Sequence, residues 1–358
     1  MPIRVLVVDD SAFMRKLIIE IINAERDLQV VGYARNGEDA LKKLGRLQVD
    51  VITLDVEMPV MDGLETLKRI MSEKPLPVVM LSSRTRKGSE TTMQALSLGA
   101  VDFVSKPAGS AAPELDSIAQ ELVDKIRCAA MAQLPSKRRA PVAVEKRPLP
   151  SLPPVPPGAA SRIVIIGSST GGPKAIEEVF AHIPENLPAG IVVVQHMPKE
   201  FTRSFAERLN SLFPFPVKEA QTGDVVENGK VLIAPGDYHL IISAERRVQL
   251  NQEDRVMFLR PAIDVTMERL PEVYGKNIIG VILTGMGRDG AKGMAGIKRA
   301  GGITIAQDRA TSTIYSMPKA VADEGNADYV LPLDKIGGVI TDLVSALDSG
   351  EVRHERLR

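Results

Sequence analysis

Short apolar runs recur along the first 130 positions, and between them apolar residues recur every three or four positions. This pattern predicts five strand–helix pairs. Runs such as Val5–Val8 are apolar at every position, which is typical of parallel strands buried on both faces. We therefore expect a doubly wound (βα)5 domain over residues 1–130. The predicted strands are Ile3–Val8, Val30–Ala34, Val49–Leu54, Pro77–Leu81 and Val101–Val104, and the predicted helices are Ala12–Ala24, Gly37–Leu47, Gly63–Ser72, Ser89–Leu98 and Pro113–Ala129.

The same alternation returns over residues 161–350. It predicts a second doubly wound, Rossmann-like α/β domain with a parallel sheet, to which Leu240–Ile242 and Val248–Leu250 add a hairpin. The other predicted strands are Ile163–Ile166, Gly190–Val194, Lys230–Ala234, Ile278–Leu283 and Gly302–Ala306, and the predicted helices are Ala175–His182, Phe201–Leu212, Ala262–Leu270 and Ala291–Ala300.

Residues 131–160 read as a basic linker between these domains, because eight of the 25 prolines fall between Pro135 and Pro157. Prolines at that density favour extended polyproline II. Two interpretations of this linker stay open, a passive spacer and a docking sequence. Residues 351–358 read as a charged tail.

Composition narrows the class of protein. The 45 basic residues balance the 45 acidic ones, which disfavours a nucleic-acid or anionic-membrane partner found by bulk charge. The single Cys128 suits reducing cytoplasm. We find neither an apolar stretch long enough to span a membrane nor a signal peptide. We expect a cytoplasmic monomer with no direct membrane insertion.

Acidic residues follow two strands of the first domain, with Asp9 and Asp10 after the first and Asp55 at the end of the third. Ser82 and Lys106 follow the fourth and fifth. Because the carboxyl ends of parallel strands meet at one edge, these groups predict a pocket for Mg²⁺ and for a phosphoryl group carried on an aspartate. Taken alone, Asp9 and Asp10 also fit an ordinary polar turn.

With these motifs, the first 130 residues resemble the receiver domain of bacterial response regulators. The resemblance implies that Asp55 accepts a phosphoryl group from a chemotaxis histidine kinase. It also implies that Asp9, Asp10, Asp55 and the backbone carbonyl of Glu57 arrange Mg²⁺, that Ser82 binds the phosphate and that Lys106 neutralises it. The matching segments are Val7–Ser11, Leu54–Gly63 and Val104–Pro107.

The second domain begins with a strand that runs into the glycine-rich segment Gly167–Gly172. Such a turn either holds a phosphate on backbone N–H groups or, as G-x-S-x-G, presents Ser169 as a nucleophile. A nucleophilic serine needs a base. Of the four histidines, His196 directly follows an apolar strand and is our choice, and taken alone it fits a hydrogen-bonded structural histidine at a strand end equally well. Asp289 could orient that base, or cap the helix that follows it.

These motifs together are similar to the chemotaxis response-regulator protein-glutamate methylesterases. The resemblance implies a Ser169–His196–Asp289 triad, an oxyanion site at the Met286 N–H and Thr170 beside the nucleophile. The other matching segments are Gln195–Pro198, Phe201–Leu209, Ile233–Gly236 and Leu283–Gly290.

The resemblance also implies a function. The enzyme would hydrolyse γ-glutamyl methyl esters, and deamidate glutamines, on the cytoplasmic helices of methyl-accepting chemoreceptors. No cofactor is expected for the esterase reaction. We expect the receiver to inhibit the second domain until Asp55 is phosphorylated. The alternative is a receiver joined to a nucleotide- or partner-binding output domain.

Overall fold

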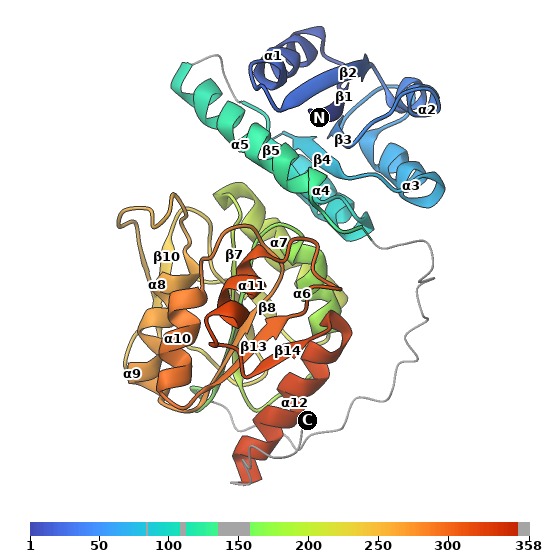
Figure 1. Cartoon of the computed structure of the whole chain (residues 1–358). Coiled ribbons are helices and arrows are strands. Elements are labelled where there is room, and N and C mark those ends of the chain that lie inside the picture. The colour runs from blue at the N-terminus through green and yellow to red at the C-terminus, as the bar shows by residue number, and fades with distance from the viewer. Residues whose placement is uncertain (84, 108–111, 135–157, 350–358) are drawn as a thin grey trace. The chain divides into compact units, whose positions relative to one another are not determined.

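The computed structural model describes residues 1–83, 85–107, 112–134 and 158–349. The chain forms two compact units, Met1–Ser136 and Lys137–Arg358 (Figure 1). Most of the predicted linker (residues 135–157) and all of the predicted charged tail lie outside the described residues. Within the described ranges, none of the helices combines the length and the apolar character needed to span a membrane.

Unit 1 is built on the predicted five-stranded parallel sheet, and the structure gives its strand order as β2-β1-β3-β4-β5. The chain reverses its direction of travel across the sheet between β1 and β3, so functional groups are expected at the carboxyl ends of those strands. The strands are β1 (Ile3–Val8), β2 (Leu28–Ala34), β3 (Val51–Asp55), β4 (Val78–Ser82) and β5 (Asp102–Ser105), and the helices are α1 (Ala12–Asn23), α2 (Gly37–Leu44), α3 (Gly63–Glu73), α4 (Arg86–Leu98) and α5 (Ala112–Ala130).

Short polar residues begin the first four helices. Each side chain accepts a hydrogen bond from a backbone N–H of the first turn, which that turn cannot satisfy by itself. These residues are Ser11, Asn36, Asp62 and Thr85. Helices α1 and α5 share one apolar cluster with the sheet, in which Val5, Ile22 and Ile126 are fully buried.

Unit 2 is built on a seven-stranded parallel sheet in the order β14-β13-β12-β6-β7-β9-β8. The chain starts at β6, extends the sheet to one side, and later returns to the other side with β12. The strands are β6 (Ile163–Ser168), β7 (Gly190–Gln195), β8 (Val217–Glu219), β9 (Val231–Ile233), β12 (Ile278–Ile282), β13 (Ile303–Gln307) and β14 (Tyr329–Leu331), and β10 (His239–Ile242) and β11 (Val248–Asn251) form the predicted hairpin.

The helices of unit 2 are α6 (Gly172–Phe180), α7 (Lys199–Leu212), α8 (Ile263–Glu268), α9 (Leu270–Tyr274), α10 (Ala291–Arg299), α11 (Ser316–Asp323) and α12 (Leu333–Ser349). The helix predicted over Ala262–Leu270 corresponds to α8, whereas α9, which begins where that prediction ends, was not predicted. Strands β8 and β14 and helices α11 and α12 were not predicted. The two strands have three residues each and lie at the edges of the sheet, so their apolar patterns are weak.

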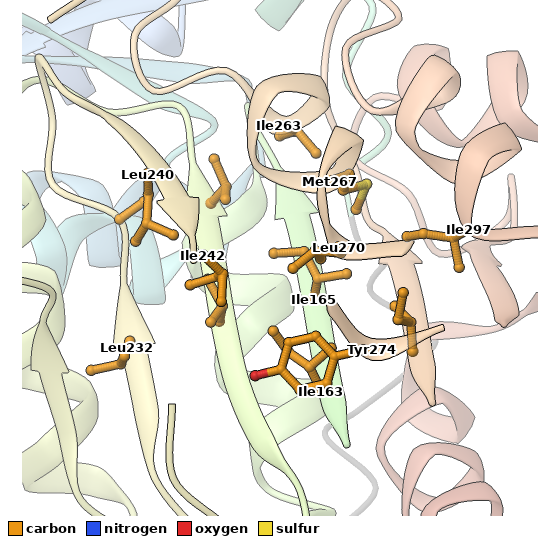
Figure 2. Close-up of a cluster of buried hydrophobic side chains, with 14 of the residues drawn as sticks. Ile163, Ile165, Leu232, Leu240, Ile242, Ile263, Met267, Leu270, Tyr274 and Ile297 are labelled. Carbon is orange, nitrogen blue, oxygen red and sulfur yellow. The ribbon is translucent and has the colours of Figure 1, made fainter. Parts of the chain in front are cut away.

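One core cluster of unit 2 joins the sheet, the hairpin and helices α8 to α10 (Figure 2). Ile163 and Ile165 of β6 contribute to it together with Leu240 of the hairpin and Met267 of α8, and each is at most 1% exposed. This packing holds α8 and α10 against the sheet, and it places Ile263, at the start of α8, beside Gly167 near the carboxyl end of β6.

We predict opposite effects on stability for two adjacent glycines of α12. A Cβ at Gly337 would lie 2.3 Å from the carbonyl oxygen of Val179 at the end of α6, whereas a Cβ at Gly338 meets no atom within 4 Å. Gly337→Ala should therefore lower the free energy of unfolding by about 1–3 kcal/mol through overpacking. Gly338→Ala should raise it by about 0.5–1 kcal/mol, because alanine favours helix.

The measurement is urea unfolding followed by near-UV circular dichroism, since four of the five tyrosines lie in unit 2. Equal effects of the two substitutions would contradict the described contact between α12 and α6.

Candidate active site and acidic pocket

Ser169, His196 and Asp289 follow three neighbouring strands of unit 2. Ser169 comes directly after β6 and His196 directly after β7, while Asp289 lies in the loop after β12, on the other side of β6. Backbone hydrogen bonds continue past the strand ends. The Ser169 N–H donates to Thr284 O at 3.0 Å, and the His196 N–H donates to Ser168 O at 3.1 Å. The structure therefore brings the three loops to one edge of the sheet.

His196 and Asp289 are in direct contact. The His196 Nε2 atom lies 2.8 Å from Asp289 Oδ2, and the two side chains are 8% and 1% exposed. Burial would raise the pKa of Asp289, but hydrogen bonds from His196 and from backbone N–H groups hold it below its ordinary value. Because an ionised carboxylate can only accept, Nε2 carries the imidazole proton and Nδ1 is left as the basic nitrogen.

Asp289 also accepts two backbone hydrogen bonds from the start of α8. The Ile263 N–H donates to Oδ2 at 2.7 Å and the Asp264 N–H donates to Oδ1 at 2.9 Å. Asp289 is therefore a helix cap, as the alternative interpretation held, but it does not cap the helix that follows it. It caps α8, while Gly290, with φ of +95°, is the N-cap of α10.

Ser169 lies against the loop that carries Met286. A Cβ on Gly285 would come within 2.7 Å of the Ser169 Cβ, so only glycine allows this approach. Among the residues that the structure describes, none accepts a hydrogen bond from the Met286 N–H, and the Met286 side chain is about half exposed. Thr170, next to Ser169, is buried, and its carbonyl accepts from the Thr284 hydroxyl at 2.9 Å.

Gln195 was not singled out from the sequence, and it joins the Ser169 and His196 segments. Its Nε2 donates to Ser169 O and to His196 O, both at 3.0 Å, and its Oε1 accepts from the Ser168 hydroxyl at 2.6 Å. The side chain is 2% exposed. A Cβ on Gly172 would lie 2.0 Å from Gln195 Oε1, which explains the glycine there. In the sequence, the signal for this role was a polar residue, glutamine, at the end of an apolar strand.

His239 is a structural histidine. It is buried, its Nδ1 accepts from the Ala262 N–H at 3.3 Å, and its Nε2 lies 3.1 Å from Asp254 O. It is the first residue of β10 and does not lie in a surface turn. With both ring nitrogens engaged by the backbone, His239 offers no free base.

Two backbone N–H groups of Gly167–Gly172 are not available to bind a phosphate. The Ser169 N–H is bound to Thr284 O, and the Gly172 N–H is bound to Ser169 O at 2.8 Å. A phosphate loop needs such groups directed at the ligand. This geometry favours the nucleophile reading of the turn.

Unit 1 carries the predicted acidic pocket. Carboxylate oxygens of Asp9, Asp10 and Asp55 all lie within 4.8 Å of one another. Lys106 Nζ lies 2.8 Å from Asp9 Oδ2 and 2.7 Å from Asp55 Oδ2. Burial would lower the pKa of Lys106, but these two carboxylates raise it above its ordinary value.

The pocket suits a further cation. Burial is the main reason that the pKa of Asp55 rises to about 6, the charge on Asp9 adds to the increase, and Lys106 only partly offsets it. Three aspartates and one lysine thus leave net negative charge in the pocket. Hard oxygen ligands of this kind are those that Mg²⁺ prefers.

The other predicted pocket residues have these positions. Ser82 is buried at the end of β4 and accepts a hydrogen bond from the Thr92 hydroxyl of α4 at 2.7 Å. Glu57 is exposed, and its N–H donates to Asp55 Oδ1 at 3.3 Å. The role of the Glu57 carbonyl as a ligand stays a prediction.

Comparison with known proteins identifies both units. Residues 5–116 match the model of the response regulator receiver domain, and residues 164–340 match that of the CheB methylesterase. A protein-glutamate methylesterase/protein-glutamine glutaminase of Symbiobacterium thermophilum is 49% identical over 355 residues, which cover 96% of this chain and 97% of that protein. A protein of the same name from Pyrococcus abyssi is 46% identical over 97% of this chain and 95% of its own.

The crystal structure of the Thermotoga maritima CheB methylesterase catalytic domain matches with a TM-score of 0.50 and 48% identity, and covers 51% of this chain and 98% of that one. The similarity to the two relatives extends over nearly the whole of each chain. The protein therefore belongs to the family of protein-glutamate methylesterase/protein-glutamine glutaminase response regulators, with a receiver domain followed by a CheB methylesterase domain.

Proposed function

We propose that Ser169, His196 and Asp289 form the triad that hydrolyses γ-glutamyl methyl esters on the cytoplasmic helices of chemoreceptors. The observation that carries the proposal is the buried His196–Asp289 pair beside the loop of Ser169. His196 Nδ1 takes the proton of the Ser169 hydroxyl as Oγ attacks the ester carbonyl. The methoxy group leaves as methanol with that proton, and water then releases the glutamate from Ser169.

The Met286 N–H is the proposed donor to the oxyanion of the tetrahedral intermediate. It belongs to the loop that contacts Ser169, and it has no acceptor among the described residues. Such a donor is typically worth about 3–4 kcal/mol in the transition state. Deamidation of glutamine is the same acyl transfer with ammonia as leaving group, so one site serves both reactions. Both would take place in the cytoplasm, where the receptor helices lie.

Ser169→Ala should abolish methanol release from methylated receptor, because it removes the attacking oxygen. We expect a loss of at least about 10³-fold in kcat. Methanol is measured after incubation with receptor membranes carrying labelled methyl groups. Ser211→Ala, on the exposed surface of α7, is the matched control and should retain full activity. Turnover retained by Ser169→Ala would falsify the triad.

Gln195→Glu should lower kcat by about 10- to 100-fold with little change in KM. The substitution places a carboxylate oxygen against the carbonyls of Ser169 and His196, where the amide now donates. The two segments should separate slightly and misalign the base. Gln249→Glu, on the exposed side of β11, makes the same change of charge away from the site. An equal loss in both variants, or a change confined to KM, would count against this role.

We propose that a chemotaxis histidine kinase phosphorylates Asp55 and thereby relieves inhibition of unit 2 by unit 1. Asp9, Asp10, Asp55 and the Glu57 carbonyl would hold Mg²⁺, which screens the charge of the incoming phosphoryl group. Lys106 would neutralise the phosphate. Ser82 would turn its hydroxyl from the carbonyls of Ser83 and Gly88, to which it donates, toward the phosphate and so report the change to α4.

Acetyl phosphate with Mg²⁺ should increase the rate of methanol release by the full chain, and Asp55→Asn should remove this response. Asp62→Asn changes a nearby exposed carboxylate that caps α3, and it should keep the response. A chain of residues 161–358 should be active without phosphodonor. If it is no faster than the unphosphorylated full chain, inhibition by unit 1 is ruled out.

A further inference from the structure

Helices α8 and α10 both begin without a cap of their own. The N-cap of α8 is Ala262 and that of α10 is Gly290, and neither makes a side-chain hydrogen bond to its helix. The first N–H groups of a helix need acceptors when they are buried. Both helices begin within the packed part of unit 2, where Ala262 and Ala291 are at most 2% exposed.

Each helix receives its cap from an aspartate of the other. Asp289, just before α10, accepts from the Ile263 and Asp264 N–H groups of α8. Asp264, in the first turn of α8, accepts from the Gly293 N–H of α10 at 2.7 Å through its Oδ1. Asp264 thus makes two contacts. Its backbone N–H binds the Asp289 carboxylate, and its own carboxylate binds α10, the helix that follows Asp289.

Close packing of the two helices makes this exchange possible. A Cβ on Gly293 would lie 2.4 Å from the Met267 Cβ of α8, so the glycine is what allows the helices to approach. A Cβ on Gly290 would meet Ile282 at 2.4 Å and Ile263 at 3.1 Å. Met267 also belongs to the apolar cluster, which includes Met294 and Ile297 of α10 and so holds the two helices together (Figure 2).

We infer that Asp264 is a positioning residue for the reaction. Through its hydrogen bond to Gly293 it fixes the start of α10 relative to α8, and so holds the Asp289 carboxylate in the orientation that binds His196 Nε2. The inference rests on the proposed function, because it assigns a second carboxylate to the same site. Asp264 does not touch the reacting atoms, and its effect passes through Asp289.

The charges around Asp264 give the role a measurable signature. Burial raises the pKa of Asp264 to about 6, and Asp289 adds to the increase, while the Gly293 and Gly290 N–H groups and Lys292 oppose it. Lys292 in turn pairs with Glu268 at 3.0 Å. At neutral pH the ionised Asp264 therefore adds negative charge beside the His196–Asp289 pair.

Two substitutions separate the hydrogen bond from the charge. Asp264→Ala removes the acceptor of the Gly293 N–H, and we expect kcat to fall by about 10- to 100-fold with KM within about twofold. Asp264→Asn keeps an acceptor but no charge. It should restore kcat to within about threefold of the unmodified chain. The change in kcat that accompanies titration of Asp264 near pH 6 should be absent from this variant, because asparagine does not titrate.

The experiment uses the full chain, activated with acetyl phosphate and Mg²⁺ if it is inhibited at rest. Rates are expressed per site titrated with a serine-directed phosphonate, so a misfolded fraction does not lower them. Asp328→Asn is the matched control. Asp328 also accepts a backbone N–H, from Thr304 at 2.9 Å, and pairs with Lys298, but it lies at β14, away from the site. It should reduce stability without a change in kcat per site or in the pH profile.

The low-field proton resonance of His196 Nε2–H gives an independent readout, and Asp264→Ala should shift or broaden it. Unchanged kcat per titrated site and an unmoved resonance in Asp264→Ala would overturn the inference, as would a failure of Asp264→Asn to recover activity. Ser169→Ala is run in parallel. Activity retained in that variant would instead overturn the proposed function.

Discussion

The buried carboxylate of Asp289 is the group on which the geometry of unit 2 depends. It is 2% exposed, so its charge must be compensated by the protein rather than by water. The compensation comes from His196 and from two N–H groups at the start of α8, over distances of 2.7–2.9 Å. One side chain thereby links the end of β7, the loop after β12 and helix α8, which are far apart in the sequence.

The two units use one topological rule and meet different electrostatic needs. In both, polar residues gather where neighbouring parallel strands end. In unit 1 burial and the nearby charge of Asp9 raise the pKa of Asp55, and Lys106 offsets the increase only in part. In unit 2 the acid is fully compensated, and the pKa of Asp289 is lowered. The first arrangement suits a further cation and a phosphoryl group, whereas the second suits a fixed partner for a histidine.

Strand patterns predicted most of the fold because strands buried on both faces are apolar at every position. The strand predicted over Ile3–Val8 agrees with β1 at both ends. The short edge strands were not predicted, because they are only partly buried and therefore lack this pattern. β14 reads Tyr-Val-Leu, and its central Val330 is exposed, so its pattern differs little from that of a loop. Helix α9 also escaped prediction, because it has only five residues and carries Pro271 in its first turn.

The site divides in the same way. By itself the sequence determined which residues follow each strand, and hence that Ser169, His196 and Asp289, or Asp9, Asp55 and Lys106, could meet at one edge. Only the tertiary structure decided which nitrogen of His196 faces Asp289, that Gln195 joins two loops, and that Asp264 and Asp289 cap each other's helices. The physical reason is the distance along the chain over which each kind of interaction acts. Apolar periodicity is a local property of the chain, whereas a hydrogen bond between residues 264 and 293 exists only once two helices have packed.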